Sequence, residues 1–219
     1  MRTIWKINNC NKLILFFTGW AMDENPTNHL QTADYDICVC FDYAKLETKE
    51  ILRWQKYDEV ILIAWSTGVW AAEQVIGTMN LPINKSIAIN GTPITVHDEF
   101  GIQRSIFQGT YDNLNENNMQ KFQRRMLGSK NALIHFSEFA PKRSIENQKK
   151  ELEIILNIDF ENLNAGSIKW DKAIIGLQDA IFPPQNQKAF WENKTIMIET
   201  EIPHFPFLEF TNWESILDL

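Results

Sequence analysis

Short apolar runs alternate with helix-like segments along most of this chain of 219 residues. Six runs have the length and composition of buried strands, and they lie at residues 12–18, 35–41, 60–64, 85–90, 170–176 and 195–199. Helix signals occur between them, at residues 26–31, 45–54, 67–79 and 184–191. Apolar strands that alternate with helices indicate a mainly parallel sheet with helices on both faces. The pattern therefore predicts one α/β domain with room for an insertion.

The alternation stops between residues 100 and 163, where the chain is rich in Asn, Gln, Lys and Phe and helical in character. Apolar side chains such as Phe107 and Phe122 require burial there, so this segment is not a linker. We expect residues 1–99 and 164–219 to form an α/β core. Residues 100–163 should form a helical lid over the carboxyl edge of the sheet, where open α/β folds bind ligands.

Charge is distributed unevenly along the chain. The formal net charge is −7, which argues against nucleic acid as a partner. Residues 103–150 nevertheless hold nine Lys and Arg against four Asp and Glu, a local charge of +5. A basic segment in an acidic protein suggests an anionic partner at one place.

Composition also limits the location and the cofactors. No apolar stretch approaches the ~20 residues of a membrane span, and the run at 13–17 is too short for a signal peptide. The chain has an odd number of cysteines, namely Cys10, Cys38 and Cys40, and they lack the neighbouring ligands of a metal site. We expect a cytoplasmic monomer with reduced thiols, no membrane partner, and neither metal nor cofactor.

Residues 59–71 (EVILIAWSTGVWA) join a predicted strand to a predicted helix through Ser66. Such a junction is typical of a nucleophile elbow, in which a sharp turn lifts the serine hydroxyl to the end of a sheet. Ala64 and Gly68 lie two positions either side of the serine, and their small size lets strand and helix approach closely. The start of the helix offers backbone N–H groups to a developing oxyanion. Ser66 is therefore the candidate nucleophile.

A serine nucleophile needs a base, and the base needs a carboxylate to orient it. Asp179 follows the strand at 170–176, and His204 follows the last predicted strand. Both should therefore leave the sheet at the same edge as Ser66, in the chain order that such a triad requires. The remaining histidines and two alternative acids fit less well; they are His29, His97, His135, Asp98 and Asp159.

Two backbone N–H groups should bind the oxyanion. One belongs to Thr67, the residue after the nucleophile. The loop FFTGWAMD follows the first long strand, and there Gly19 permits close backbone approach. The N–H of Trp20 is the natural second donor.

Four motifs resemble those of the α/β-hydrolase superfamily; they are T-G-W at 18–20, A-W-S-T-G at 64–68, G-L-Q-D-A-I-F-P at 176–183 and P-H-F-P-F at 203–207. With its short length and modest lid, the chain most resembles the pimeloyl-[acyl-carrier protein] methyl ester esterases of biotin synthesis, in their compact BioG form. This resemblance implies Ser66 as nucleophile, His204 as base and Asp179 as its partner. It also implies Trp20 and Thr67 as oxyanion donors.

The resemblance further implies a substrate: a pimeloyl chain capped as a methyl ester and tethered to an acidic acyl carrier protein. The basic segment suits that partner, with contacts expected from Lys121, Arg124, Arg125, Lys142 and Arg143. Two residues depart from the family pattern. Ala64 replaces the usual first Gly of the elbow, and Pro203 replaces the usual Gly before the histidine.

Other functions remain open on the sequence. The chain could be a general short-chain esterase, or a related serine lyase or thioesterase on the same scaffold. Its six arginines lie away from the predicted strand ends, which disfavours a lyase for carboxylated ring substrates. A third alternative is an acyl-carrier-binding module without catalysis, in which Ser66 would not react with a fluorophosphonate.

Overall fold

A seven-stranded sheet forms the centre of the computed structural model, which describes residues 1–32, 34–79, 81–163 and 165–219. The spatial order is β1-β3-β2-β4-β5-β6-β7. The strands are β1 (Arg2–Lys6), β2 (Lys12–Phe17), β3 (Asp36–Phe41), β4 (Glu59–Trp65), β5 (Lys85–Ile89), β6 (Lys172–Gln178) and β7 (Ile196–Pro203). Only β1 pairs antiparallel within this sheet; the other neighbours are parallel. The predicted mainly parallel α/β architecture is confirmed.

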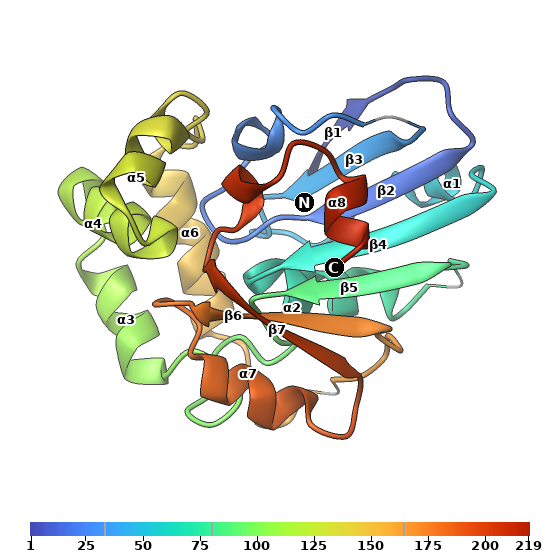
Figure 1. Cartoon of the computed structure of the whole chain (residues 1–219). Coiled ribbons are helices and arrows are strands. Elements are labelled where there is room, and N and C mark those ends of the chain that lie inside the picture. Colours follow the sequence, from blue (N-terminus) through green and yellow to red (C-terminus); the bar gives the residue numbers. More distant parts are fainter. Residues whose placement is uncertain (33, 80, 164) are drawn as a thin grey trace.

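The central strands are apolar because helices cover both faces of the sheet. In β2, β3 and β4, every residue after the first is buried. Figure 1 shows α8 in front of the sheet, with α1 and α2 behind it. The bounds of the core helices are α1 (Ile51–Trp54), α2 (Thr67–Ile76), α7 (Pro184–Trp191) and α8 (Glu214–Leu217). Among the described residues, no helix has both the length and the apolar character that a bilayer span demands.

Four helices lie between β5 and β6 in the chain, and Figure 1 shows them gathered beyond one end of the sheet. They are α3 (Arg104–Asp112), α4 (Glu116–Leu127), α5 (Lys130–Ser137) and α6 (Ile145–Leu156). Side-chain caps begin three of them, since Asn115, Ser129 and Ser144 each accept a backbone N–H of the first turn. Gly128, with φ +71°, ends α4. Residue 164, the predicted start of the second core segment, lies outside the described residues.

Three predicted helices are wrong in extent, and the one predicted over 67–79 ends at Ile76. The segment 45–50 is not helical, because the N-terminal ammonium of Met1 binds the Lys45 and Glu47 carbonyls there. The Trp5 indole also donates to the Glu50 carboxylate (3.1 Å), so this segment is held beside β1 and α1 begins only at Ile51. At 26–31, only a 3₁₀ turn forms, η1 (Asn25–Thr27).

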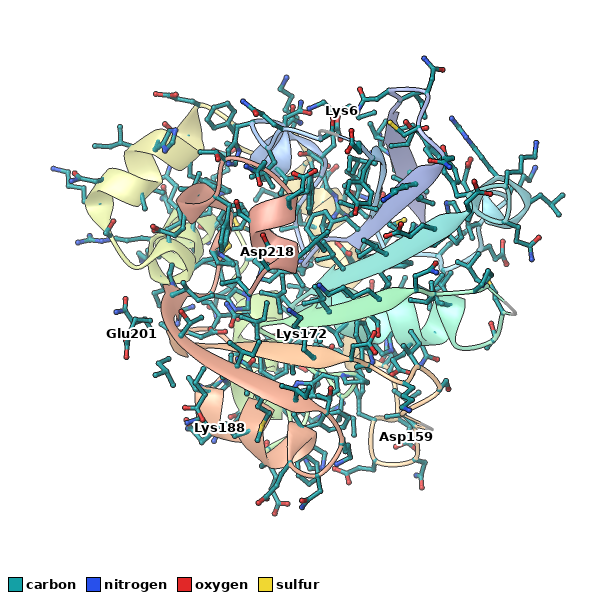
Figure 2. All side chains as sticks on the ribbon, turned by 45° about the vertical axis from the view of Figure 1, so that its right-hand side comes forward. Lys6, Asp159, Lys172, Lys188, Glu201 and Asp218 are labelled. Carbon is teal, nitrogen blue, oxygen red and sulfur yellow. The ribbon has the colours of Figure 1, made fainter. Side chains whose placement is uncertain are left out.

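Strand β1 and helix α8 were not predicted. The alternating, half-exposed residues of β1 produce no continuous apolar run, and this strand is defined by pairing with β3. Helix α8 is one short turn whose end is fixed by tertiary contacts: Lys85 and Lys172 both donate to the Leu217 carbonyl (2.6 and 3.1 Å). Figure 2 shows Lys172 and Asp218 on this side of the sheet.

Helix α2 approaches the end of β2 very closely at Gly68. A Cβ added there would lie 2.3 Å from the Phe17 carbonyl oxygen and 2.4 Å from that of Thr18. The first turn of α2 therefore has room only for glycine, and this contact fixes the helix start behind Ser66.

Gly68→Ala should destabilise the fold by at least about 2 kcal/mol, since two backbone oxygens must shift to admit the methyl group. Gly109→Ala is the matched control, because a Cβ in that helical position meets no atom within 4 Å. It should stabilise the protein by about 0.5–1 kcal/mol through helix propensity. Urea unfolding of both variants measures the difference, and equal effects would contradict the close packing.

Candidate active site

Ser66 occupies the sharp turn between β4 and α2. Its backbone has φ +57° and ψ −127°, a conformation that L-residues rarely adopt. The Ser66 N–H donates to the Ile89 carbonyl (2.9 Å), and the Ser66 carbonyl accepts from Val69 N–H (3.0 Å). A Cβ at Gly91 would lie 2.4 Å from the Ser66 carbonyl oxygen. The turn is thus held from both sides by neighbouring backbone.

Three predicted side chains meet at the carboxyl edge of the sheet. Asp179 directly follows β6, and His204 directly follows β7. His204 Nδ1 lies 2.8 Å from Asp179 Oδ2, and His204 Nε2 lies 3.0 Å from Ser66 Oγ. An ionised carboxylate only accepts hydrogen bonds, so Nδ1 carries the hydrogen and Nε2 accepts from the serine hydroxyl. All three residues are buried, which strengthens these interactions.

The Asp179 carboxylate is fixed by further donors. Its Oδ1 accepts from the backbone N–H groups of Ile181 and Phe182, each at 2.8 Å. Its Oδ2, besides facing the imidazole, accepts from Gln187 Nε2 at 3.1 Å. Sequence reasoning missed Gln187; its position one turn into a helix after a Pro-Pro pair carries no signal of that contact.

The alternative acids and histidines lie elsewhere. Asp98 accepts from Arg104 N–H, and Asp159 from Asn162; both acids are exposed. Each remaining histidine has local contacts of its own: His29 binds the Phe207 carbonyl, His97 accepts from Glu99 and Phe100 N–H, and His135 packs on Phe139. Asp179 is thus the carboxylate that contacts His204 among the described residues.

The two predicted oxyanion donors border the same pocket as Ser66. Among the described residues, neither the Trp20 nor the Thr67 N–H donates to a backbone carbonyl. A Cβ at Gly19 would lie 2.7 Å from the Trp65 ring, so this loop packs directly on the residue before the nucleophile. The Trp20 indole donates to the Gln148 carbonyl on α6 (2.8 Å), which ties the loop to the insertion.

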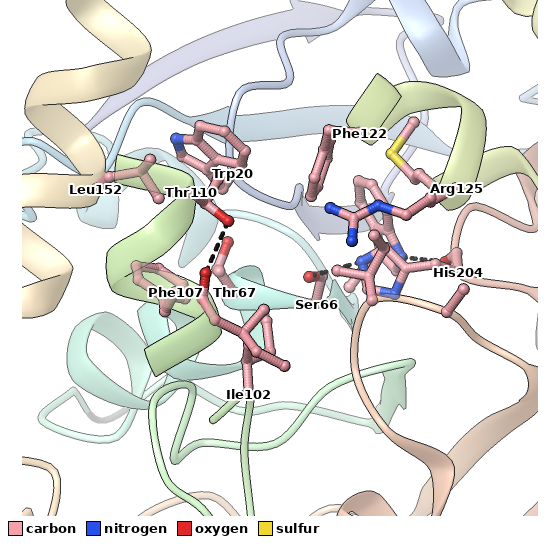
Figure 3. Close-up of a pocket in the computed structure, with 15 residues that line it drawn as sticks. Trp20, Ser66, Thr67, Ile102, Phe107, Thr110, Phe122, Arg125, Leu152 and His204 are labelled. Atoms are coloured by element: carbon pink, nitrogen blue, oxygen red, sulfur yellow. Dashed lines mark hydrogen bonds between the residues drawn. The ribbon is translucent and has the colours of Figure 1, made fainter. Parts of the chain in front are cut away.

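The pocket above Ser66 is walled mainly by apolar side chains from the sheet edge and the inserted helices. Figure 3 shows Ser66 and His204 on one side, with Trp20, Phe107 and Leu152 facing them. Arg125 of α4 is exposed and also borders the pocket. The Thr67 hydroxyl is buried there and has no hydrogen-bond partner among the described residues. Such a pocket suits an apolar chain with few polar groups.

A groove between α3 and α4 adjoins this pocket. The two share Ile106, Thr110, Phe122 and Arg125 as lining residues. Lys121 and Arg124 line the groove further out and are exposed. Lys142 is also exposed, but it lies after α5, away from this groove.

The expectation that Arg143 is a surface contact is wrong. Its side chain is 2% exposed, and it pairs with the buried Glu151 (2.7 Å) and with Asp42 (3.3 Å). It also donates to the Met22 carbonyl (3.1 Å). Burial raises the pKa of the Glu151 carboxyl, and the Arg143 guanidinium opposes that rise. Arg143 is therefore a structural cation that joins the base of the insertion to the core.

This geometry has the parts needed to activate a hydroxyl for attack on a carbonyl. The His204 imidazole contacts the hydroxyl and the Asp179 carboxylate contacts the imidazole. Trp20 and Thr67, whose N–H groups have no backbone acceptor among the described residues, line the same pocket. A family model described as pimeloyl-ACP methyl esterase BioG matches residues 1–216. The chain belongs to the BioG family. The resemblance inferred from the four motifs is thereby confirmed.

Two solved structures show how far the BioG likeness extends. BioG from Haemophilus influenzae superposes with a TM-score of 0.89 at 34% identity, covering 98% of this chain and 99% of that chain. An esterase from Exiguobacterium antarcticum superposes with a TM-score of 0.76 at 14% identity, covering 99% and 94%. The second likeness concerns the fold alone, that of an α/β-hydrolase.

A relative from Bacteroides fragilis (strain 638R) is 46% identical to this BioG-family chain over 179 residues. It is named malonyl-[acyl-carrier protein] O-methyltransferase. The match takes in 82% of this chain but 36% of that protein, so the chain spans about a third of the relative's length.

Arg143→Ala should destabilise the protein by about 3–5 kcal/mol, because it leaves the buried Glu151 without its partner. Lys142→Ala, one residue earlier and exposed, should change stability by less than about 0.5 kcal/mol. Equilibrium urea unfolding at neutral pH compares the two. Similar losses in both variants would rule out the buried pair as a structural element.

Proposed function

We propose that this protein is a serine carboxylesterase that hydrolyses the methyl ester of pimeloyl-acyl carrier protein to free pimeloyl-acyl carrier protein in biotin synthesis. The observation that carries the proposal is the continuous hydrogen-bonded series from Asp179 through His204 to Ser66, at the wall of an apolar pocket. Membership of the BioG family supports the choice of substrate. The reaction needs no metal or cofactor, and its place of action is the cytoplasm.

The chemistry follows from the contacts of His204. Ser66 Oγ attacks the ester carbonyl carbon while His204 Nε2 takes the hydroxyl proton. The tetrahedral intermediate collapses as Nε2 returns that proton to the leaving methoxy group, and methanol departs. Water then attacks the acyl-enzyme, His204 again moves the proton, and Ser66 is regenerated with release of the acid.

Negative charge on the carbonyl oxygen would be held by the N–H groups of Trp20 and Thr67. Their lack of backbone partners among the described residues leaves both free to bind it. In a buried site such donors act strongly, because little water competes with them. The close packing of Gly19 on Trp65 supports this role by fixing the loop relative to Ser66.

Residues 100–163 are proposed as the lid that contains the acyl chain. Their aromatic and aliphatic side chains form much of the pocket wall. The groove between α3 and α4 then gives the carrier's flexible arm a path to Ser66. Lys121, Arg124 and Arg125 lie along that groove and would attract an acidic carrier protein, with Lys142 as a more distant contact.

The Bacteroides fragilis relative supports the same setting, because its name describes methyl transfer to a carrier-tethered acid. A methyl group that such a transferase adds must later be removed, and the proposed esterase would catalyse that removal. Two alternatives are outcomes of the tests below: a general short-chain esterase and a non-catalytic carrier-binding module. The third alternative is a serine lyase or thioesterase, which would release no methanol from the methyl ester.

Ser66→Ala should lower kcat by about 10⁴-fold or more, because the nucleophile is lost. Asp179→Asn should cost about 10⁴-fold through the wrong imidazole tautomer. Asp159→Asn is the matched control at an alternative, exposed acid and should leave the rate unchanged. Methanol release from pimeloyl-carrier methyl ester measures all three. Full activity of Ser66→Ala would end the proposal, and a wild-type protein that never labels with a fluorophosphonate would favour the non-catalytic module.

Substrate preference tests the narrower assignment. The purified protein is given pimeloyl-carrier methyl ester and, separately, short p-nitrophenyl esters. We expect kcat/KM to be at least roughly 10²-fold higher for the tethered ester, since binding energy from the carrier and its arm is used at the reacting centre. Equal or reversed preference would reduce the protein to a general esterase.

Arg124→Glu should raise KM for the carrier-tethered ester roughly tenfold by repelling the acidic carrier. The effect should shrink as salt is added, because exposed charges are screened. Lys56→Glu serves as control, since Lys56 is exposed just before β4 begins, at the opposite edge of the sheet. Neither change should alter rates on p-nitrophenyl esters. Equal effects of both reversals would argue against a defined carrier surface on α4.

A further inference from the structure

A buried asparagine lies beneath the candidate base. Asn90 directly follows β5 and has no exposed surface. Its backbone has φ +47°, in the left-handed region that asparagine tolerates better than most residues. The chemistry of Ser66, Asp179 and His204 does not require an amide at this position. The sequence around Asn90 also predicted no role for it.

The Asn90 amide joins three segments of the chain. Its Oδ1 accepts from the Gly176 N–H of β6 (2.7 Å). Its Nδ2 donates to the carbonyls of Pro203 (2.8 Å) and His204 (2.9 Å). One carbonyl acceptor and two N–H donors are needed for this set, and a carboxamide is the side chain that supplies them.

The ladder between β6 and β7 is irregular at this point. Gly176 faces Thr200, whereas Gln178 faces Pro203, so β7 holds one more residue than β6. Such bulges redirect side chains and leave backbone groups without a ladder partner. The Asn90 amide occupies the gap, and a Cβ at Gly176 would lie 2.9 Å from Asn90 Oδ1. The amide thus binds backbone groups of both strands at the bulge.

His204 follows the bulge, and its backbone is held on two sides. Besides Asn90, the Trp65 indole donates to the His204 carbonyl (2.7 Å). Asn90 also precedes Gly91, which packs against the Ser66 carbonyl. The same short segment thus touches the backbone of both the nucleophile and the base, although it touches neither reacting atom.

We infer that Asn90 is a positioning residue that sets the distance between His204 Nε2 and Ser66 Oγ. This inference rests on the proposed function, because it concerns the same base and nucleophile. The same amide also gives the partly buried Pro203 carbonyl, just before the base, a hydrogen-bond donor. A displacement of about 1 Å at this point would lower the rate about 10²-fold.

Two variants test the inference. Asn90→Gly removes the side chain and suits the positive φ, so the backbone is not strained. Asn90→Asp keeps the shape but sets carboxylate oxygens against two carbonyls. Each should lower kcat on pimeloyl-carrier methyl ester by about 10²-fold, with KM changed by less than about threefold. The low-field proton resonance of His204 Nδ1–H, which donates to Asp179, should shift or vanish in both.

Asn186→Ala is the matched control. Asn186 is also a buried amide that donates to two backbone carbonyls, those of Asp98 (2.9 Å) and Gly101 (2.8 Å), but it contacts none of the triad. We expect it to lose comparable thermal stability while it keeps kcat and the low-field resonance. If one Asn90 variant does not fold, the other provides the comparison.

The outcomes separate this inference from the proposed function. If Ser66→Ala is inactive but a folded Asn90 variant keeps wild-type kcat and resonance, the inference is overturned and the proposed function stands. If Ser66→Ala retains activity, the proposed function fails first. Equal losses of kcat in the Asn186 and Asn90 variants would also overturn the inference about Asn90, because the loss would then reflect general stability.

Discussion

The strained turn at Ser66 is the constraint on which this site depends. A non-glycine residue with φ +57° costs about 1–3 kcal/mol, and this conformation persists only because the surrounding structure enforces it. Here the enforcement comes from backbone packed against backbone, with Gly68 on β2 and Gly91 on Ser66 itself. The strain points the hydroxyl away from the sheet and toward the imidazole. The His204 imidazole, held by Asp179, then contacts this hydroxyl.

The positions of Asp179 and His204 follow from the topology of the sheet. Parallel strands place their carboxyl ends at one edge, so residues more than 100 positions apart in the chain become neighbours. This is why strand-end positions, together with the serine junction and the chain order, predicted which side chains would meet. The apolar runs of the central strands are long and buried, and such elements are the ones that sequence patterns specify best.

Elements that depend on partners were not predictable in the same way. Strand β1 exists through pairing with β3, and the turn of α8 through two lysines that bind the Leu217 carbonyl. Arg143 reads as one more basic residue of a basic segment, and only the fold brings Asp42 and Glu151 to it. The roles of Gln187 and Asn90 were likewise not predictable. A single amide side chain forms no repeating pattern in the sequence, and its role depends on which groups the fold places beside it.

Hydrogen bonds join the inserted helices to the Trp20 loop, residues 18–23. The Trp20 indole donates to the Gln148 carbonyl, and the Arg143 guanidinium donates to the Met22 carbonyl. The Lys142 N–H donates to the Asp23 carboxylate (2.7 Å). A chimaera that imports the inserted helices of another α/β-hydrolase would consequently lose the hydrogen bonds that hold the loop at 18–23. Within this architecture, an exchangeable module for engineering must therefore carry residues 142–148 and the loop at 18–23 together.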